Sequence, residues 1–75
     1  MTRLAIIAGK GQLPVDVAAA AAAGGFDVLI LPITGQADAD FNAYQTMQIR
    51  LGAIGEIRTI MVQNKIEKLV MVGKV

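Results

Sequence analysis

Residues 3–14, RLAIIAGKGQLP, decide the fold of this chain, because a strand, a glycine turn and a helix start follow one another without interruption. Leu4 to Ala8 is an apolar run without alternation, which is typical of a central parallel strand covered on both faces. Pro14 suits the first helical turn, where a missing N–H costs nothing. Helix N-termini bind anions, and glycines allow a phosphate to approach the backbone closely. The stretch therefore predicts an α/β fold with an anion site behind its first strand.

Length and composition favour a single domain, residues 1–75. The chain is 55% hydrophobic and 17% charged, so we expect part of its surface to meet a second domain or another copy. A net charge of +1 gives no support for nucleic-acid binding. Cysteine and histidine are both absent, which excludes disulfides, thiolate metal sites and histidine as a general base. No apolar run reaches the roughly 18 residues of a membrane span.

The remaining pattern predicts two βαβ units. The first helix continues through the alanine tract to Ala23 and ends at Gly24-Gly25. Strands are expected at 26–31, within 45–51 and at 68–72, with a loop at 33–44 and a second helix opened by 52–56. We expect a small, mostly parallel, Rossmann-like sheet of about four strands in the order 3-2-1-4, with two helices. The link between the second and third strands lacks a helix, so one sheet face is expected to be thinly covered.

Four glycine-containing loops would meet at the carboxyl edge of such a sheet, where ligands bind at the switch point of the strand order. Lys10 lies in the first of these loops and is either a phosphate contact or a solvated lysine. The candidate residues for binding a nucleotide or substrate are Gly9, Lys10, Gly11, Leu13, Thr34, Gly35, Gly52, Ile54, Gly55 and Gly73.

A dinucleotide site is disfavoured by two departures from its motif. Gly9-x-Gly11-x-x-Pro14 has proline where the third glycine belongs, and no acidic residue stands at the end of the second strand to hold a ribose. Lys10 is also outside a G-K-[ST] context, so the loop is not a Walker loop.

Other residues have plainer interpretations than a functional one. Asp38 and Asp40 are the one close carboxylate pair, and capping or solvation is favoured over a magnesium site. Tyr44 is expected to pack against the sheet edge rather than stack on a base. We expect core packing rather than a lipid groove from three methionines: Met47, Met61 and Met71.

Four segments together resemble a known family. They are 7–14 (IAGKGQLP), 33–38 (ITGQAD), 51–57 (LGAIGEI) and 70–75 (VMVGKV), and the resemblance extends over essentially all 75 residues. In order and spacing they are similar to the N-terminal part of the bacterial UDP-2,3-diacylglucosamine pyrophosphatases of the LpxI type. Lys10 and Lys74 depart from the pattern, since many relatives carry glycine, asparagine or alanine there.

The resemblance implies a two-domain enzyme that hydrolyses UDP-2,3-diacylglucosamine to lipid X and UMP in lipid A synthesis. It implies a divalent metal, usually Mg²⁺, with the catalytic acids and metal ligands in a C-terminal domain outside this chain. The chain itself would be the N-terminal domain, inactive alone, which cradles the UDP end of the lipid substrate against its own C-terminal domain. A homodimer and peripheral contact with the inner membrane from the cytoplasm are further expectations.

Two alternatives remain open from the residues themselves. One is a stand-alone nucleotide-binding module, and the other is an interaction domain that dimerises through its apolar surface without catalysis.

Overall fold

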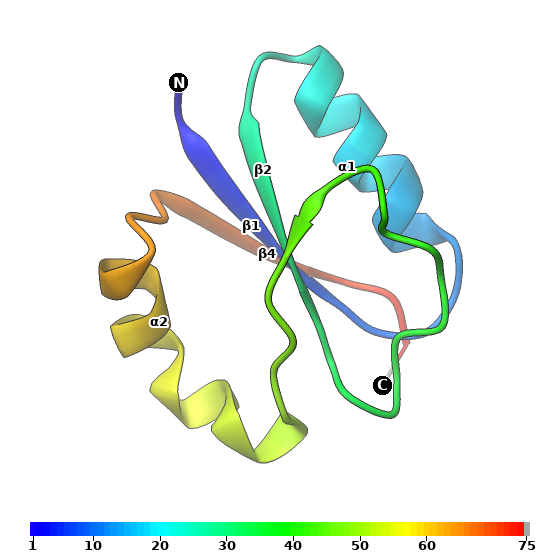
Figure 1. Ribbon diagram of the computed structural model, residues 1–75, viewed down its shortest axis with the longest axis vertical. Helices are drawn as coiled ribbons and strands as arrows, with labels where there is room; N and C mark the ends of the chain where they lie inside the picture. Colours follow the sequence, from blue (N-terminus) through cyan, green and yellow to red (C-terminus); the bar gives the residue numbers. More distant parts are fainter. Residues whose placement is uncertain (75) are drawn as a thin grey trace.

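A computed structural model describes residues 1–74 of the chain as a parallel sheet of four strands in the order β3-β2-β1-β4, with helices on both faces (Figure 1). The predicted α/β fold, strand order and pair of helices are thereby confirmed. The elements along the chain are β1 Arg3–Ala8, α1 Leu13–Ala23, β2 Asp27–Pro32, β3 Gln45–Thr46, the 3₁₀ helix η1 Leu51–Glu56, α2 Ile57–Gln63 and β4 Lys68–Val72.

Strand β1 is the central strand and pairs in parallel with β2 on one side and β4 on the other. Ile6 stands opposite Ile30 of β2 and Val70 of β4. Ala5 to Ala8 are no more than 2% exposed, because both faces of the strand are covered. This burial explains why the sequence of β1 is apolar throughout instead of alternating.

Two apolar clusters, one on each face of the sheet, form the core. Odd-numbered residues of β1 and β2 face α2, and even-numbered residues face α1, as the period of a strand requires. The buried members on the α2 face are Ala5, Ile7, Leu29, Leu31, Ile33, Ile49 and Ile66. Those on the α1 face are Ile6, Ala8, Ala18, Val28, Ile30 and Phe41.

The segment 33–44 crosses the α1 face and, within the described chain, takes the place of a crossover helix (Figure 1). Phe41 is buried in the α1-face cluster and Tyr44 packs against it. The expectation of thin cover is therefore wrong for this face, because an irregular segment supplies apolar side chains where a helix would stand. The expectation that Tyr44 packs rather than projects is consistent with its half-buried position.

Helix α1 ends as the two glycines predict. The Phe26 N–H donates to the Ala21 carbonyl and the Gly25 N–H to the Ala22 carbonyl, both at 3.1 Å. This pair of bonds is the Schellman arrangement, which needs a left-handed residue just after the helix. Gly25 supplies it with φ of +93°.

The second helix is split, which the sequence pattern did not indicate. Residues Leu51–Glu56 form a 3₁₀ helix, and regular α-helix begins only at Ile57. Gly52 and Gly55 stand three residues apart, and glycine is a poor α-helix former because it loses the most backbone entropy on ordering. Strand β3 is also shorter than the expected region, with two residues, and an isolated bridge between Ile33 and Ile49 extends its pairing with the β2 side.

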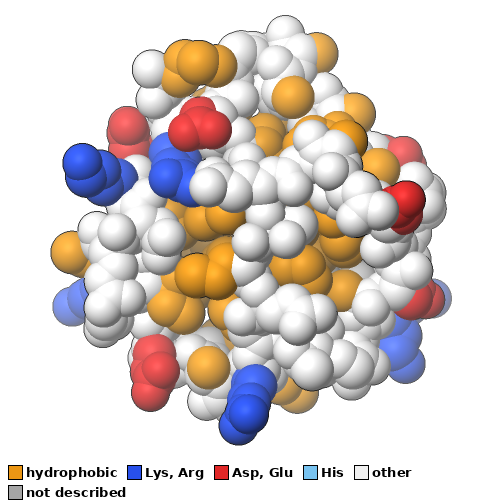
Figure 2. Space-filling view, in the orientation of Figure 1, with side chains coloured by type: hydrophobic (Ala, Val, Ile, Leu, Met, Phe, Trp, Pro, Cys, Tyr) orange, Lys and Arg blue, Asp and Glu red, His pale blue; other side chains and the backbone are white. Residues whose placement is uncertain are grey.

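Strand β4 forms an edge of the sheet, and two of its apolar side chains are exposed to solvent. Val70 is 38% exposed and Met71 is 55% exposed. The expectation that Met71 fills the core is therefore wrong, although Met47 and Met61 do pack against the α2-face cluster. Figure 2 shows further apolar atoms exposed over the middle of the viewed face, with most charged side chains toward its periphery.

We predict that Gly25→Ala lowers the free energy of unfolding by about 1–2 kcal/mol, because alanine at φ +93° is strained. Urea denaturation measures this. Gly24→Ala is the matched control, since Gly24 has φ of −80° and the nearest atoms to an added Cβ lie at an ordinary 3.5 Å. Equal stabilities of the two variants would contradict the assigned helix end.

Candidate functional site

The loops that follow β1 and β4 lie side by side at the carboxyl edge of the sheet (Figure 1). These loops line an open pocket of about 560 Å³, together with the start of α1 and one residue of the 33–44 segment. Its lining residues are Lys10, Gly11, Gln12, Leu13, Asp38, Gly73 and Lys74. Four of the ten predicted binding residues thus share one pocket, which we call the glycine pocket.

Backbone contact between two glycines closes one side of the glycine pocket. A Cβ on Gly73 would lie 2.8 Å from the Lys10 carbonyl oxygen and 3.0 Å from the Gly9 carbonyl carbon. A Cβ on Gly9 would overlap the Lys74 carbonyl. Both positions therefore have a packing reason to be glycine, and their contact with a ligand stays a prediction.

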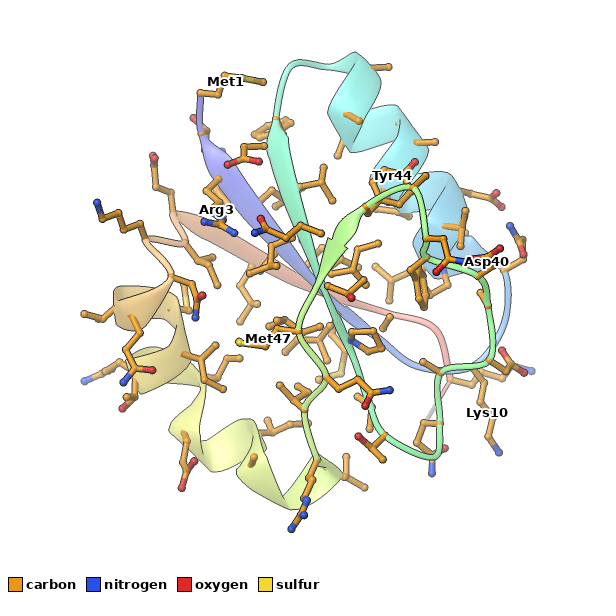
Figure 3. All side chains as sticks on the ribbon, viewed as in Figure 1. Met1, Arg3, Lys10, Asp40, Tyr44 and Met47 are labelled. Atoms are coloured by element: carbon orange, nitrogen blue, oxygen red, sulfur yellow. The ribbon has the colours of Figure 1, made fainter. Side chains whose placement is uncertain are left out.

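This packing pairs Lys10 with Lys74 in an antiparallel bridge. The Lys10 N–H donates to the Lys74 carbonyl at 2.6 Å, and the Lys74 N–H donates to the Lys10 carbonyl at 3.2 Å. Both residues are exposed. Figure 3 shows the Lys10 side chain projecting from this edge. Two cations that the sequence separates by most of the chain therefore flank the same pocket.

The N-terminus of α1 lies in the glycine pocket beside them. Gly11 has φ of +99°, a left-handed conformation that a side chain rarely adopts. Gln12 precedes the helix without a side-chain cap, and Pro14 occupies its first turn. The positive end of the helix dipole therefore faces a pocket that already holds two lysines.

Asp38 reaches this helix start from the segment 33–44. Its Oδ1 accepts the Gly11 N–H at 2.8 Å. The preference for a capping role over a metal role agrees with this bond, although the capped group lies just before the helix. Asp40 instead accepts the Asn42 N–H at 2.9 Å, which forms a local turn.

Thr34 and Gly35 lie at the same edge but outside the lining of the glycine pocket. The Thr34 N–H donates to the Ile49 carbonyl at 2.8 Å, which ties the end of β2 to the segment after β3. Gly35 has φ of +82° and lies in a turn that the Gln36 N–H closes on the Ile33 carbonyl at 2.9 Å. The exposed Thr34 hydroxyl stays available as a predicted contact.

Gly52, Ile54 and Gly55 do not join the glycine pocket. All three lie in η1, where Ile54 packs against the α2-face cluster. An added Cβ on either glycine would meet open space. In this chain the second glycine-rich segment therefore lies apart from the first, and its binding role stays a prediction.

Sequence reasoning missed Gln12 and Lys74 as lining residues and Asp38 as the partner of Gly11. Gln12 lies between two of the predicted residues, Gly11 and Leu13, and its position there is the signal that could have identified it. Lys74 belongs to a loop that the sequence predicts at this edge, although it is not among the ten candidate residues. No local signal could indicate the Asp38 contact, because it joins residues 27 positions apart.

A second hollow, of about 350 Å³, lies between β3 and the segment 33–44. Phe41, Tyr44 and Thr46 contribute to its lining. Figure 3 places Tyr44 on this segment beside α1, away from Lys10. Apart from the single tyrosine, no sequence feature predicts this hollow.

Among residues 1–74, no three acidic, histidine or cysteine side chains gather closely enough to hold a metal ion. Neither Asp38 nor Asp40 is supported by further acidic ligands, and each accepts a backbone N–H. No helix within the described part of the chain is long and apolar enough to cross a bilayer.

We predict that Asp38→Ala lowers the free energy of unfolding by about 1 kcal/mol, because the Gly11 N–H loses its acceptor. Hydrogen exchange followed by NMR should show faster exchange at Gly11. Asp38→Asn is the control, since its amide oxygen still accepts the bond. Unchanged exchange at Gly11 in the alanine variant would refute the assigned contact.

A comparison with protein families matches residues 3–75 to the model of the LpxI N-terminal domain. The match confirms the resemblance drawn from the four segments. No curated protein matches the chain significantly.

Proposed function

The chain belongs to the LpxI family, as its N-terminal domain, and on that premise we propose that it cradles the nucleotide end of the family's substrate. LpxI is the UDP-diacylglucosamine hydrolase of the lipid A pathway, so the substrate is a lipid that carries a nucleoside diphosphate. The reaction we propose for the complete enzyme releases lipid X and UMP. The part that this domain plays in it rests on the following argument.

The glycine pocket carries the proposal, because its position and its charge both suit a diphosphate. It lies past the carboxyl ends of β1 and β4, where the chain order of the sheet switches direction. Ligands of open α/β sheets bind at this point. Lys10 and Lys74 supply two positive charges, and the start of α1 adds the positive end of its dipole.

The carboxylate of Asp38 competes with an anionic ligand for the glycine pocket. Its carboxylate already accepts the Gly11 N–H, which is the group that a phosphate oxygen would approach. A bound phosphate either displaces this carboxylate or lies beside it, and the two lysines offset the repulsion between the negative groups. This competition supports weak binding by the domain alone.

Hydrolysis itself we assign to acidic residues of a C-terminal domain outside these 75 residues. The described residues do not fit a magnesium site, because neither Asp38 nor Asp40 has further acidic ligands nearby. We therefore route no catalytic step through a metal held by this domain. Its own residues bind and orient the diphosphate and help to exclude water from the substrate.

A second role, docking onto another domain or another copy, is favoured by one observation. Val70 and Met71 on the edge strand β4 are exposed although both are apolar. The two residues are consecutive in the strand and face opposite sides of the sheet, so the feature that favours docking is the edge strand itself, whose backbone and apolar side chains can pair with another chain. This role is compatible with cradling the nucleotide, since β4 also leads into the glycine pocket.

We predict that Lys10→Gln and Lys74→Gln each weaken UMP and UDP binding about threefold, because each removes one exposed charge beside the phosphates. Isothermal titration calorimetry at low ionic strength, where screening is weakest, measures the change. Lys68→Gln is the matched control, since Lys68 lies at the amino-terminal end of β4, away from the carboxyl ends where the glycine pocket lies. Equal losses in all three variants, or none, would contradict binding at the glycine pocket.

We also predict that the purified chain does not hydrolyse UDP-2,3-diacylglucosamine, with or without Mg²⁺. Release of UMP followed by chromatography is the measurement, and a complete family enzyme provides the positive control. Turnover that copurifies with the chain, and that survives removal of contaminating phosphatases, would show that catalytic groups lie within these residues.

A further inference from the structure

The segment 33–44 is joined to the rest of the domain by very few hydrogen bonds. The Ala37 N–H donates to the Ile33 carbonyl at 3.0 Å, and the other backbone bonds of residues 35–44 likewise stay within the segment. Among residues 1–74, the bond from the Gly11 N–H to Asp38 is the one hydrogen bond that ties residues 35–44 to another part of the chain. Asp38 therefore holds this part of the segment at the start of α1.

Side-chain packing next to Asp38 is light, so this bond carries much of the attachment. Ala37 and Ala39 are half-buried against the α1-face cluster, and alanine buries little apolar area. Firm anchors lie on either side, at Thr34, whose N–H is bonded to the segment after β3, and at the buried ring of Phe41. Because Asp38 is exposed, water can replace either partner of its bond. Residues 35–39 can therefore leave α1 and return while the rest of the domain stays folded.

The Gly11 N–H is a donor that Asp38 and a bound anion both require. It belongs to the lining of the glycine pocket, next to Lys10 and just before the uncapped start of α1. A carboxylate and a phosphate oxygen are both charged acceptors, and two negative groups at one donor repel each other. Occupation of the glycine pocket by an anion and its closure by Asp38 are therefore alternative states.

We propose that Asp38 is a latch: an anion that binds in the glycine pocket takes the Gly11 N–H, displaces the carboxylate and releases residues 35–39 from the start of α1. The inference rests on the proposed function, because it takes the diphosphate end of the substrate as the displacing anion. Since only the open state binds, the closed latch lowers the apparent affinity, and a change that opens the latch raises it. Binding at one edge of the sheet thus alters the segment that covers its α1 face.

NMR of the ¹⁵N-labelled chain, with pyrophosphate as the probe, tests the latch. Pyrophosphate should shift the amide resonance of Gly11, and it should speed hydrogen exchange at Ala37, whose bond to Ile33 loosens when residues 35–39 are released. In Asp38→Ala, exchange at Ala37 should be fast before any addition, and pyrophosphate should leave it unchanged. An anion that lies beside an intact latch would instead slow exchange at Ala37 or leave it as it is.

Three results would overturn the proposal. A shift at Gly11 with unchanged or slower exchange at Ala37 refutes the latch and leaves the proposed function in place. A shift at Gly11 in Asp38→Ala alone shows that the carboxylate blocks the pocket without being displaced. No shift at Gly11 in either chain refutes the latch and the proposed function together.

Matched variants of the two carboxylates on the segment add a test by affinity. Asp38→Asn should strengthen pyrophosphate binding about threefold or more, because a neutral amide oxygen holds the Gly11 N–H less strongly and does not repel the anion. Asp40→Asn is the control, since it removes the same charge from the same segment outside the lining of the glycine pocket. Isothermal titration calorimetry at about 0.15 M salt, where distant exposed charges are screened, should show a change of less than about twofold for this control. Equal affinities of Asp38→Asn and the unaltered chain would overturn the latch.

Discussion

The direct backbone contact of Gly9 with Gly73 and Lys74 is the constraint on which the carboxyl edge depends. No side-chain atom fits between these two loops, so they can approach closely enough to exchange hydrogen bonds between Lys10 and Lys74. That exchange is an antiparallel bridge between the loops that follow β1 and β4, beyond the end of their parallel pairing. It also sets two cations beside the start of α1. The charge of the glycine pocket is therefore a consequence of packing as much as of residue choice.

Much of the fold follows from local pattern. The unbroken apolar run of β1 indicates burial on both faces, and the double glycine indicates the end of α1, because each signal arises from neighbouring residues. The split of the second helix at Ile57 did not follow from the apolar period, since Gly52 and Gly55 leave that period intact while weakening α-helix. Exposure of Met71 was also hidden, because hydrophobicity does not distinguish a central strand from an edge strand.

The candidate site, like the fold, was predictable from the sequence only in part. Topology alone predicts that the loops after parallel strands meet at one edge, and Lys10, Gly11, Leu13 and Gly73 do share a pocket. Which loops touch depends on side-chain reach, so the contact from Asp38 and the separate position of η1 emerge only in three dimensions. The hollow between β3 and the segment 33–44 lay beyond prediction for a related reason. Most of its lining comes from an irregular segment, whose path no periodicity specifies.

The order of pairing around β1 has a consequence for synthesis. The central strand leaves the ribosome before the other strands of this sheet, yet Leu4 must wait for Lys68 before its second neighbour exists. Long-range parallel pairing forms slowly because the loop must close before its contacts stabilise it. Until then one hydrogen-bonding edge of an apolar strand is open to other chains. The speed with which β4 is translated thus bears directly on the yield of correctly assembled domain.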